Sequence, residues 1–245
     1  MAKYMLFDTE TTGNQEDDKI IQVGGMLIHS RDKIQKFDEL CSTDVAIKIE
    51  AMEVHNITPD IIEGKPNFKE TNFWKVLNEN NNSENYLIAH NISFDLGMLV
   101  KEGFENQYQL IDTVRCAKHL LPNSPYHRLQ YLRYSLGLYK DEQAEANKQD
   151  IVIKAHDAIG DVLVMKLLLS KLFVLVKEQF EGADIMAKLA QLTQTPVLMR
   201  EFKFGKYKGQ SIEEVSQSDQ GYLSWMFKNL DLDEDMKYTL QQYMH

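Results

Sequence analysis

The stretch Tyr4-Met-Leu-Phe-Asp-Thr-Glu-Thr-Thr-Gly13 joins a short apolar run to two acids and a turn. Its first half predicts a buried strand at Tyr4–Asp8. Asp8 and Glu10 are one residue apart, so on a strand their carboxylates project to the same side. Two carboxylates this close repel each other unless a cation lies between them. The stretch therefore predicts a cation-binding strand end, with a solvated strand end before a Thr-Gly turn as the plainer alternative.

Further strands and helices are expected outward from this stretch. Ile20–Ile28 and Lys33–Leu40 continue it as a three-stranded meander, and two more strands are expected at Tyr86–His90 and Gln109–Asp112. The longest helix is expected over Asp157–Phe180, where apolar residues on nearly every face indicate burial against a sheet. This order indicates an α/β fold with a mixed β-sheet and helices on both faces. Shorter helices are expected near Glu50–His55, Pro59–Glu63, Phe68–Asn78, Ser93–Glu102, Val114–Leu121, Leu129–Leu136 and Asp184–Leu192.

The character of the sequence changes in its last quarter. Arg200–Lys208 alternates basic and aromatic residues, and two or three polar helices are expected from there to His245. We therefore expect a main domain over residues 1–180 and a small C-terminal module over residues 181–245.

The composition restricts the class of protein. A chain of 245 residues with 43% hydrophobic residues is typical of a globular protein. Its most apolar segment carries Asp161, Lys166 and Lys171, which argues against a membrane span. Cys41 and Cys116 are far apart and there is no secretory signal, so we expect a cytoplasmic protein with two structural thiols.

The net charge of −10 argues, by itself, against a nucleic-acid partner, because phosphate binding usually needs excess Lys and Arg. Two arrangements can reverse this interpretation. Acids can be gathered around bound cations, and basic residues can be gathered in one patch. Arg200–Lys208 holds four cations and one acid, a local sum of +3, and we expect it to be the only concentrated positive patch.

Two further segments carry isolated acids. In Ala89–Asp95 a strand runs into a helix, and Asp95 falls in the first helical turn, where an acid is stabilised by the helix dipole and needs no metal. In His156–Asp161 the second acid, Asp161, lies on a helix otherwise covered with apolar residues. An unpaired charge is costly to bury there. A satisfied buried Asp161 beside a surface His156 is the alternative.

Taken together, the segments resemble a known family. The order Asp8-x-Glu10, Asp95 and His156-x4-Asp161 resembles the DnaQ-like (DEDDh) 3′→5′ exonucleases. Residues 51–58, with the core Val-His-Asn-Ile-Thr, look like that family's Val-His-Gly-Ile-Thr helix, with Asn where Gly is common. Phe202–Gly209 and Gly221–Asn229 resemble the tail of a bacterial branch that degrades DNA from 3′ ends. The resemblance covers essentially the whole chain and implies a ribonuclease-H-like fold.

The resemblance also implies a chemistry. Two Mg²⁺ ions, for which Mn²⁺ can substitute, would assist hydrolysis of DNA to nucleoside 5′-monophosphates. By the family pattern, Asp8 bridges both ions, Glu10 and Asp161 hold the ion that binds the attacking water, and Asp95 acts near the second ion. His156 is the candidate general base, because imidazole titrates near neutral pH. DNA repair or recombination is the implied role.

Substrate contacts are expected around these motifs. Related enzymes often place an apolar wedge after Thr-Gly, where this chain has Asn14 and Gln15. We expect His90 to be structural, because Mg²⁺ prefers oxygen ligands, and Trp74 and Trp225 to be core residues. Structural roles are the alternatives for several of the expected substrate contacts, which are Thr9, Thr11, Asn14, Gln15, His55, Asn91 and Phe94, with Lys206 and Lys208 on phosphates.

Two other functions remain open from the sequence. One is an exonuclease that trims RNA 3′ ends, since no residue is identified as a reader of the 2′-hydroxyl. The other is a proofreading or accessory subunit of a DNA polymerase. The resemblance of the tail to a DNA-degrading branch favours hydrolysis of DNA from 3′ ends over both of these functions. The expected partner is therefore single- or double-stranded DNA ends, with no membrane contact and protein partners unknown.

Overall fold

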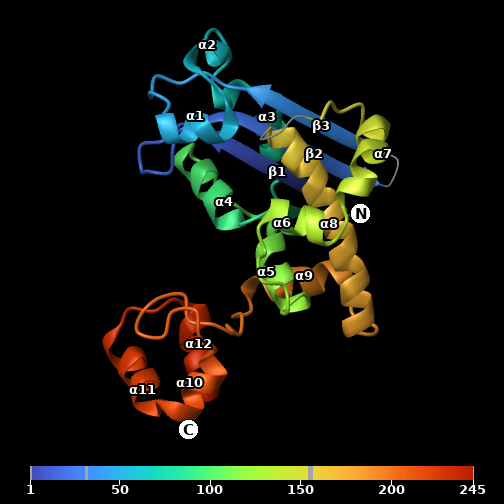
Figure 1. Ribbon diagram of the computed structural model, residues 1–245. Coiled ribbons are helices and arrows are strands. Elements are labelled where there is room, and N and C mark those ends of the chain that lie inside the picture. Colours follow the sequence, from blue (N-terminus) through green and yellow to red (C-terminus); the bar gives the residue numbers. More distant parts are fainter. Residues whose placement is uncertain (1, 31–32, 154–156, 245) are drawn as a thin grey trace. The chain divides into compact units, whose positions relative to one another are not determined.

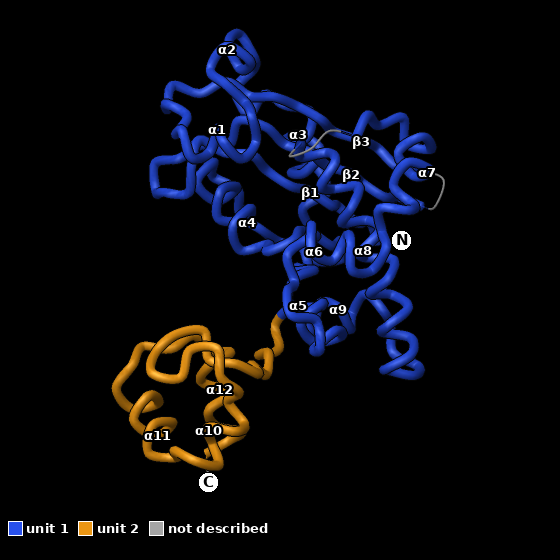
Figure 2. The backbone as a smooth tube through the Cα atoms, in the orientation of Figure 1, with its two compact units in different colours: residues 1–193 blue, residues 194–245 orange. Residues whose placement is uncertain are grey.

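The computed structural model describes residues 2–30, 33–153 and 157–244, and it divides into two compact units, Met1–Thr193 and Gln194–His245 (Figure 2). The expected boundary followed residue 180. The first unit extends further because helix α9 (Ile185–Gln194) buries apolar side chains such as Leu189 and Leu192 in the same core as the long helix α8 (Ala158–Gln179).

The first unit is built on a five-stranded sheet. Its strands are β1 (Tyr4–Thr11), β2 (Ile20–Ser30), β3 (Lys33–Leu40), β4 (Tyr86–Ala89) and β5 (Gln109–Asp112), in the order β3-β2-β1-β4-β5. The first three of these strands are labelled in Figure 1. The first three form the antiparallel meander expected from the sequence, and β4 and β5 add in parallel. The mixed sheet is therefore confirmed.

Helices cover both faces of this sheet, because the strands are apolar on both sides. Met5 and Phe7 pack on one face with α3 (Asn72–Glu79) and α4 (Ile92–Lys101). Leu6, between them, points to the opposite face. That face is covered by α8 and α9 together with α5 (Thr113–Leu120), α6 (Leu129–Ser135) and α7 (Tyr139–Gln149).

Two local features depart from the expectation. The sequence pattern did not predict α7, a polar helix that buries Glu142 and Ala146. The helix expected over Phe68–Asn78 is divided into a short 3-10 turn η1 (Phe68–Glu70) and α3, because Thr71 is extended and caps α3 by accepting from the Trp74 N–H at 3.1 Å.

Two short helices, α1 (Ile49–His55) and α2 (Pro59–Ile62), follow the meander. Asn56 ends α1 with a φ of 59°. This is the left-handed conformation that Gly adopts freely and Asn tolerates better than most residues. The conformation explains how Asn occupies the position where related sequences often have Gly.

The second unit is a small three-helix module. Its helices α10 (Ile212–Ser218), α11 (Gln220–Asn229) and α12 (Glu234–Tyr243) enclose a core that includes the fully buried Phe202. The expectation that Trp225 is a core residue is wrong, because 50% of it is exposed and its ring stacks on Tyr222 at the surface. Trp74 does pack against the core of the first unit.

Candidate active site

The acidic end of β1 extends beyond its parallel neighbour. Pairing with β4 ends at Leu6, whereas pairing with β2 continues to Thr11. Asp8 and Glu10 have the same parity along the strand as Leu6, so they face the α8 side of the sheet. Thr9 points the other way, toward α4. The extension therefore presents side chains to helices on both faces.

The start of α8 rests directly on β2 beside these acids. Gly24 is the cross-strand partner of Asp8, and a Cβ added there would lie 2.3 Å from the backbone carbon of Ala158. Only a residue without a side chain allows this approach. Gln22, the partner of Glu10, donates from Nε2 to Asp157 Oδ1 at 2.7 Å. These contacts bring the first turn of α8, with Asp161, to the acids of β1.

The fourth carboxylate comes from the opposite side. Asp95 is buried in the first turn of α4, as expected, and its Oδ1 accepts from the N–H of Thr9 at 3.0 Å and from Thr9 Oγ1 at 2.7 Å. Thr9 therefore positions Asp95. Asn91 precedes α4 with a φ of 76°, and its N–H donates to Asp112 Oδ1, so its clearest role is to form the turn.

The four carboxylates form one electrostatic group. Burial, and then the charges of Asp95, Asp161 and Glu10, hold the pKa of Asp8 well above its usual range. Burial and the neighbouring acids, with Asp161 first, raise the pKa of Glu10 to about 8. Burial also raises the pKa of Asp95 to about 7, against the hydrogen bonds from Thr9.

Such a group favours positive charge, and carboxylate oxygens are the donors that Mg²⁺ and Mn²⁺ prefer. The donor set therefore fits divalent cations. Over the described residues, however, no three acid, His or Cys side chains close into a compact metal-ligand cluster. Two of the carboxylates already accept hydrogen bonds from neighbouring side chains. Thr9 donates to Asp95, and Gln130 Nε2 donates to Asp161 Oδ1 at 2.8 Å.

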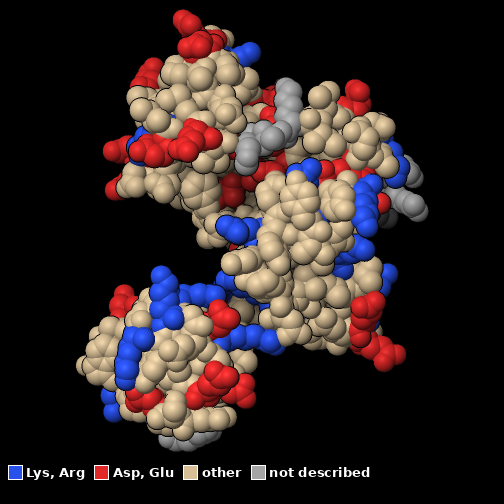
Figure 3. Space-filling model, in the orientation of Figure 1, with Lys and Arg blue, Asp and Glu red and all other residues tan. Residues whose placement is uncertain are grey.

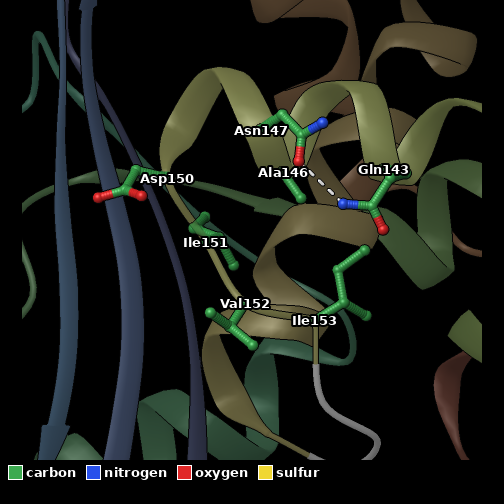
Figure 4. Close-up of a pocket in the computed structure, with 7 residues that line it drawn as sticks. All are labelled: Gln143, Ala146, Asn147, Asp150, Ile151, Val152 and Ile153. Atoms are coloured by element: carbon green, nitrogen blue, oxygen red, sulfur yellow. Dashed lines mark hydrogen bonds between the residues drawn. The ribbon is translucent and has the colours of Figure 1, made fainter.

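The expected general base, His156, lies outside the described residues. The segment that leads to it forms, with α7, the wall of a cavity of about 560 Å³ (Figure 4). Of the described residues lining this cavity, Asp150 is the only charged one, and Gln143 donates to Asn147 across one turn of α7. The described part of the cavity wall therefore adds no second charged group.

A second cavity adjoins the acids of β1. It has a volume of about 640 Å³, and Glu10 lines it together with residues of α1 and α4. A space of this size accommodates a mononucleotide-sized ligand. Among the expected contacts, Asn91 does not line it. The expected contacts that it does bring together are Thr9, Thr11, Asn14, Gln15, His55 and Phe94.

Two histidines predicted near the site have defined structural bonds. His55 Nδ1 accepts from the N–H of Ile57 at 2.9 Å, so its Nε2 carries the proton and donates to the carbonyl of Thr11 at 3.2 Å. Burial lowers its pKa, which keeps the ring neutral. His90 bonds Thr113 Oγ1 and the carbonyl of His127, and burial lowers its pKa to about 4. The structural interpretation of His90 agrees with these contacts.

The turn that carries Asn14 and Gln15, two residues lining this cavity, is held by hydrogen bonds to Asp18. Buried Asp18 accepts from the Gln15 N–H at 2.6 Å, from Thr12 Oγ1 and from Lys48 Nζ. Although burial opposes it, these hydrogen bonds lower the pKa of Asp18. The Asn14 and Gln15 side chains are exposed and bonded to each other at 2.9 Å.

No sequence pattern indicated the chain of contacts behind Asp161. Gln130 of α6, which donates to Asp161, accepts in turn from Arg133 Nη1 at 3.1 Å. Arg133 is paired with the buried Glu142 of α7. The apolar spacing of Leu129 and Leu132 predicts which face of α6 is buried. It does not predict that Gln130, beside that face, contacts a carboxylate.

Carboxylates that approach one another from β1, α4 and α8 suit hydrolysis of a phosphodiester with the help of divalent cations. The chain belongs to the exonuclease family of ribonuclease T and DnaQ-like enzymes, whose model matches residues 5–169, and it is an exonuclease of this family. Residues 202–231 match the exodeoxyribonuclease X-like C-terminal family. The resemblance read from the sequence, which for the tail was to exodeoxyribonuclease X, is therefore confirmed.

Similar proteins agree with this assignment. The Escherichia coli K12 protein Exodeoxyribonuclease 10 is 28% identical over 98% of this chain and 97% of its own length. The PolC-type DNA polymerase III of Clostridium perfringens is 27% identical over 75% of this chain but only 12% of its own length. A structure of exonuclease X with 5′-overhanging duplex DNA shares the fold, with a TM-score of 0.51 and 22% identity over 76% of this chain and 99% of that one.

Proposed function

We propose that this exonuclease hydrolyses DNA from 3′ ends to nucleoside 5′-monophosphates, with two divalent cations, in DNA repair or recombination. The observation that carries the proposal is the meeting of four carboxylates from β1, α4 and α8 beside a cavity of about 640 Å³. The cavity accepts the terminal nucleotide, and the carboxylates lie where its phosphodiester is placed.

Each acid has a stated task in this proposal. When bound, Mg²⁺ or Mn²⁺ ions neutralise the phosphate and activate water for attack. Asp8 would be the ligand shared between the ions, and Glu10 and Asp161 would complete one site. Asp95, oriented by Thr9, would serve the other. His156 accepts the proton of the attacking water.

DNA is favoured over the alternatives by the extent of the similarity. A relative that matches along nearly its whole length is named an exodeoxyribonuclease, and the C-terminal segment matches the exodeoxyribonuclease X-like C-terminal family. The match to the PolC-type polymerase covers a small part of that protein. These matches favour a separate DNA-degrading enzyme over an RNA-trimming enzyme or a polymerase subunit.

The proposal also places the enzyme in the cytoplasm. Both cysteines are buried, and burial raises the pKa of each thiol to about 12, which suits structural thiols in a reducing compartment. No helix within the described residues is both long and apolar enough to cross a bilayer.

The proposed function is tested by digestion of 5′-end-labelled single-stranded DNA, duplex DNA and RNA of one sequence. We expect a ladder of DNA shortened from the 3′ end, absent in EDTA and restored by excess Mg²⁺ or Mn²⁺. Ca²⁺ should support binding with little cleavage, because its larger and more flexible ligand shell fits the two-ion geometry poorly. Equal activity in EDTA would contradict the use of metal ions, and faster shortening of RNA would favour the RNA alternative.

We further propose that the C-terminal module holds DNA through Lys206 and Lys208. Lys208 is exposed, with no ion pair among the described residues. Lys206 is exposed too, but its Nζ bonds Asp219 Oδ2 at 3.0 Å and lies 4.6 Å from the centroid of the Tyr207 ring. A phosphate must therefore compete with Asp219 for Lys206, whereas Lys208 is available without competition.

The double variant Lys206→Ala/Lys208→Ala should bind single-stranded DNA more weakly and with less dependence on salt. Each lost phosphate contact flattens the slope of log affinity against log salt by about 0.7, so the two together should remove roughly 1–1.5 units. Fluorescence anisotropy in Ca²⁺ at several salt concentrations measures this slope. Turnover at saturating DNA should stay near that of the wild type.

The matched control is Lys75→Ala/Lys177→Ala, which removes two exposed lysines of the first unit. This control should leave the slope unchanged. Identical slopes for the wild type and the Lys206/Lys208 variant would exclude a DNA-holding role for these lysines.

A further inference from the structure

One long segment of this acidic chain contains no acid. Between Thr113 and Lys140 there is neither Asp nor Glu, although the whole chain has 37. Four of the eleven tyrosines fall in the same segment. Arg200–Lys208 is therefore not the only concentration of positive charge, contrary to our expectation. The cations of the acid-free segment are Arg115, Lys118, Arg128, Arg133 and Lys140.

The second half of this segment, α6 with its two flanks, exposes aromatic rings beside cations. Tyr126, Tyr134 and Tyr139 are 54%, 60% and 46% exposed. The Arg128 guanidinium lies 5.0 Å from the centroid of the Tyr126 ring, and Lys140 Nζ lies 5.9 Å from that of Tyr139. We call these five residues the tyrosine–arginine surface.

This surface adjoins the carboxylates. Gln130 on α6 donates to Asp161, and Tyr134 follows one turn later on the same side of the helix. Four helical residues rise about 6 Å along the axis, roughly the length of one or two nucleotides. Figure 3 shows basic side chains beside α6, next to a recess in which acidic side chains lie.

The surface and the nucleotide-sized cavity lie on different elements. The cavity is lined by the end of β1, the turn after it, α1 and α4, and none of its lining residues belongs to α6. Asp161, bonded to Gln130 of α6, belongs to the acid group that includes Glu10, a residue of the cavity wall. A strand whose last nucleotide fills the cavity would therefore pass the acids and reach Tyr134 of α6, with the other residues of the tyrosine–arginine surface on either side of that helix.

We propose that the tyrosine–arginine surface binds the single-stranded DNA segment that precedes the nucleotide being removed. Its tyrosines offer faces on which bases stack, and Arg128 and Lys140 contact phosphates, the combination by which proteins hold single strands without reading sequence. The inference rests on the proposed function and adds a second DNA contact in the first unit, independent of the C-terminal module.

The test compares Tyr134→Ala and Arg128→Ala with Tyr134→Phe, which keeps the ring. Binding of a 5′-fluorescein-labelled 12-residue oligothymidylate to the full chain is followed by anisotropy in Ca²⁺. We expect Tyr134→Ala to weaken binding about 5-fold or more and Tyr134→Phe to bind like the wild type. Arg128→Ala should flatten the salt slope by about 0.7. Inhibition by thymidine 5′-monophosphate, which needs only the cavity, should be unchanged in all three.

Each other result is decisive. Unchanged affinity of both alanine variants for the 12-mer, in a wild-type protein that degrades DNA, would overturn this inference and leave the proposed function intact. Equal weakening of the 12-mer and of the mononucleotide would show a disturbed site rather than a lost surface, and would also overturn it. A wild-type protein that shortens no DNA would overturn the proposed function itself.

Discussion

Asp8→Ala should lose at least about 10³-fold in turnover, the scale of losing a major source of transition-state charge stabilisation. Burial and the charges of Asp95, Asp161 and Glu10 all raise the pKa of Asp8, so its removal affects the whole acid group. Rates are measured with end-labelled DNA in Mg²⁺. Asp44→Ala, which removes an exposed acid elsewhere on the first unit, is the control and should be active. A variant at position 8 that retains more than about 1% activity would exclude a bridging role.

The same substitution should stabilise the metal-free protein. The pKa values of Asp8, Glu10 and Asp95 are raised above those of the unfolded chain, so the native state binds more protons between about pH 4 and 8. The free energy of unfolding therefore falls as pH rises through this window. In EDTA, Asp8→Ala should melt above the wild type at pH 8, and the difference should shrink toward pH 5. A pH-independent difference would contradict the electrostatic explanation.

His156→Ala should lower turnover by roughly 10²–10⁴-fold, the usual range for loss of a general base. DNA affinity in Ca²⁺ should hardly change, because the base acts on water rather than on the strand. The acidic limb of the pH–rate profile should flatten, since the group that must be deprotonated is gone.

His29→Ala is the matched control for this variant. His29 follows Ile28, which pairs with Tyr4 at the end of β1 remote from the acids. An unaltered pH–rate profile in His156→Ala would assign the proton transfer to another group.

Local patterns were sufficient to predict the sheet and the first two acids. Strand alternation and the Asp-x-Glu spacing operate within a few residues, so β1 and the shared side of Asp8 and Glu10 followed directly. Asp95 and Asp161 required the family resemblance, because helix capping explains Asp95 equally well and a satisfied buried side chain explains Asp161. The approach of Asp161 to the acids of β1 depends on Gly24, and the sequence alone does not show that α8 lies against this glycine.

Features that depend on neighbours far along the chain could not be predicted. Helical spacing suggested that Trp225 was buried, but spacing does not reveal whether another element covers that side of α11. The ion pair of Lys206 with Asp219 joins residues 13 positions apart, and it forms only because the fold of the second unit brings them together. The composition of the segment does not predict it. Gln130 likewise lies 31 positions from the carboxylate it contacts.

The absence of a side chain at Gly24 has a consequence for how inactive variants are interpreted. A methyl group there would meet the main chain of Ala158, and main chain yields only by moving the helix. Displacing a reacting group by about 1 Å can reduce a rate about 100-fold. A genetic screen for loss of activity would thus recover Gly24 alongside the acids, although glycine contributes no chemical group. In this protein, a position that tolerates no substitution can be one that sets the place of a helix as well as one that supplies a chemical group. Melting and metal-binding measurements distinguish these two kinds of position.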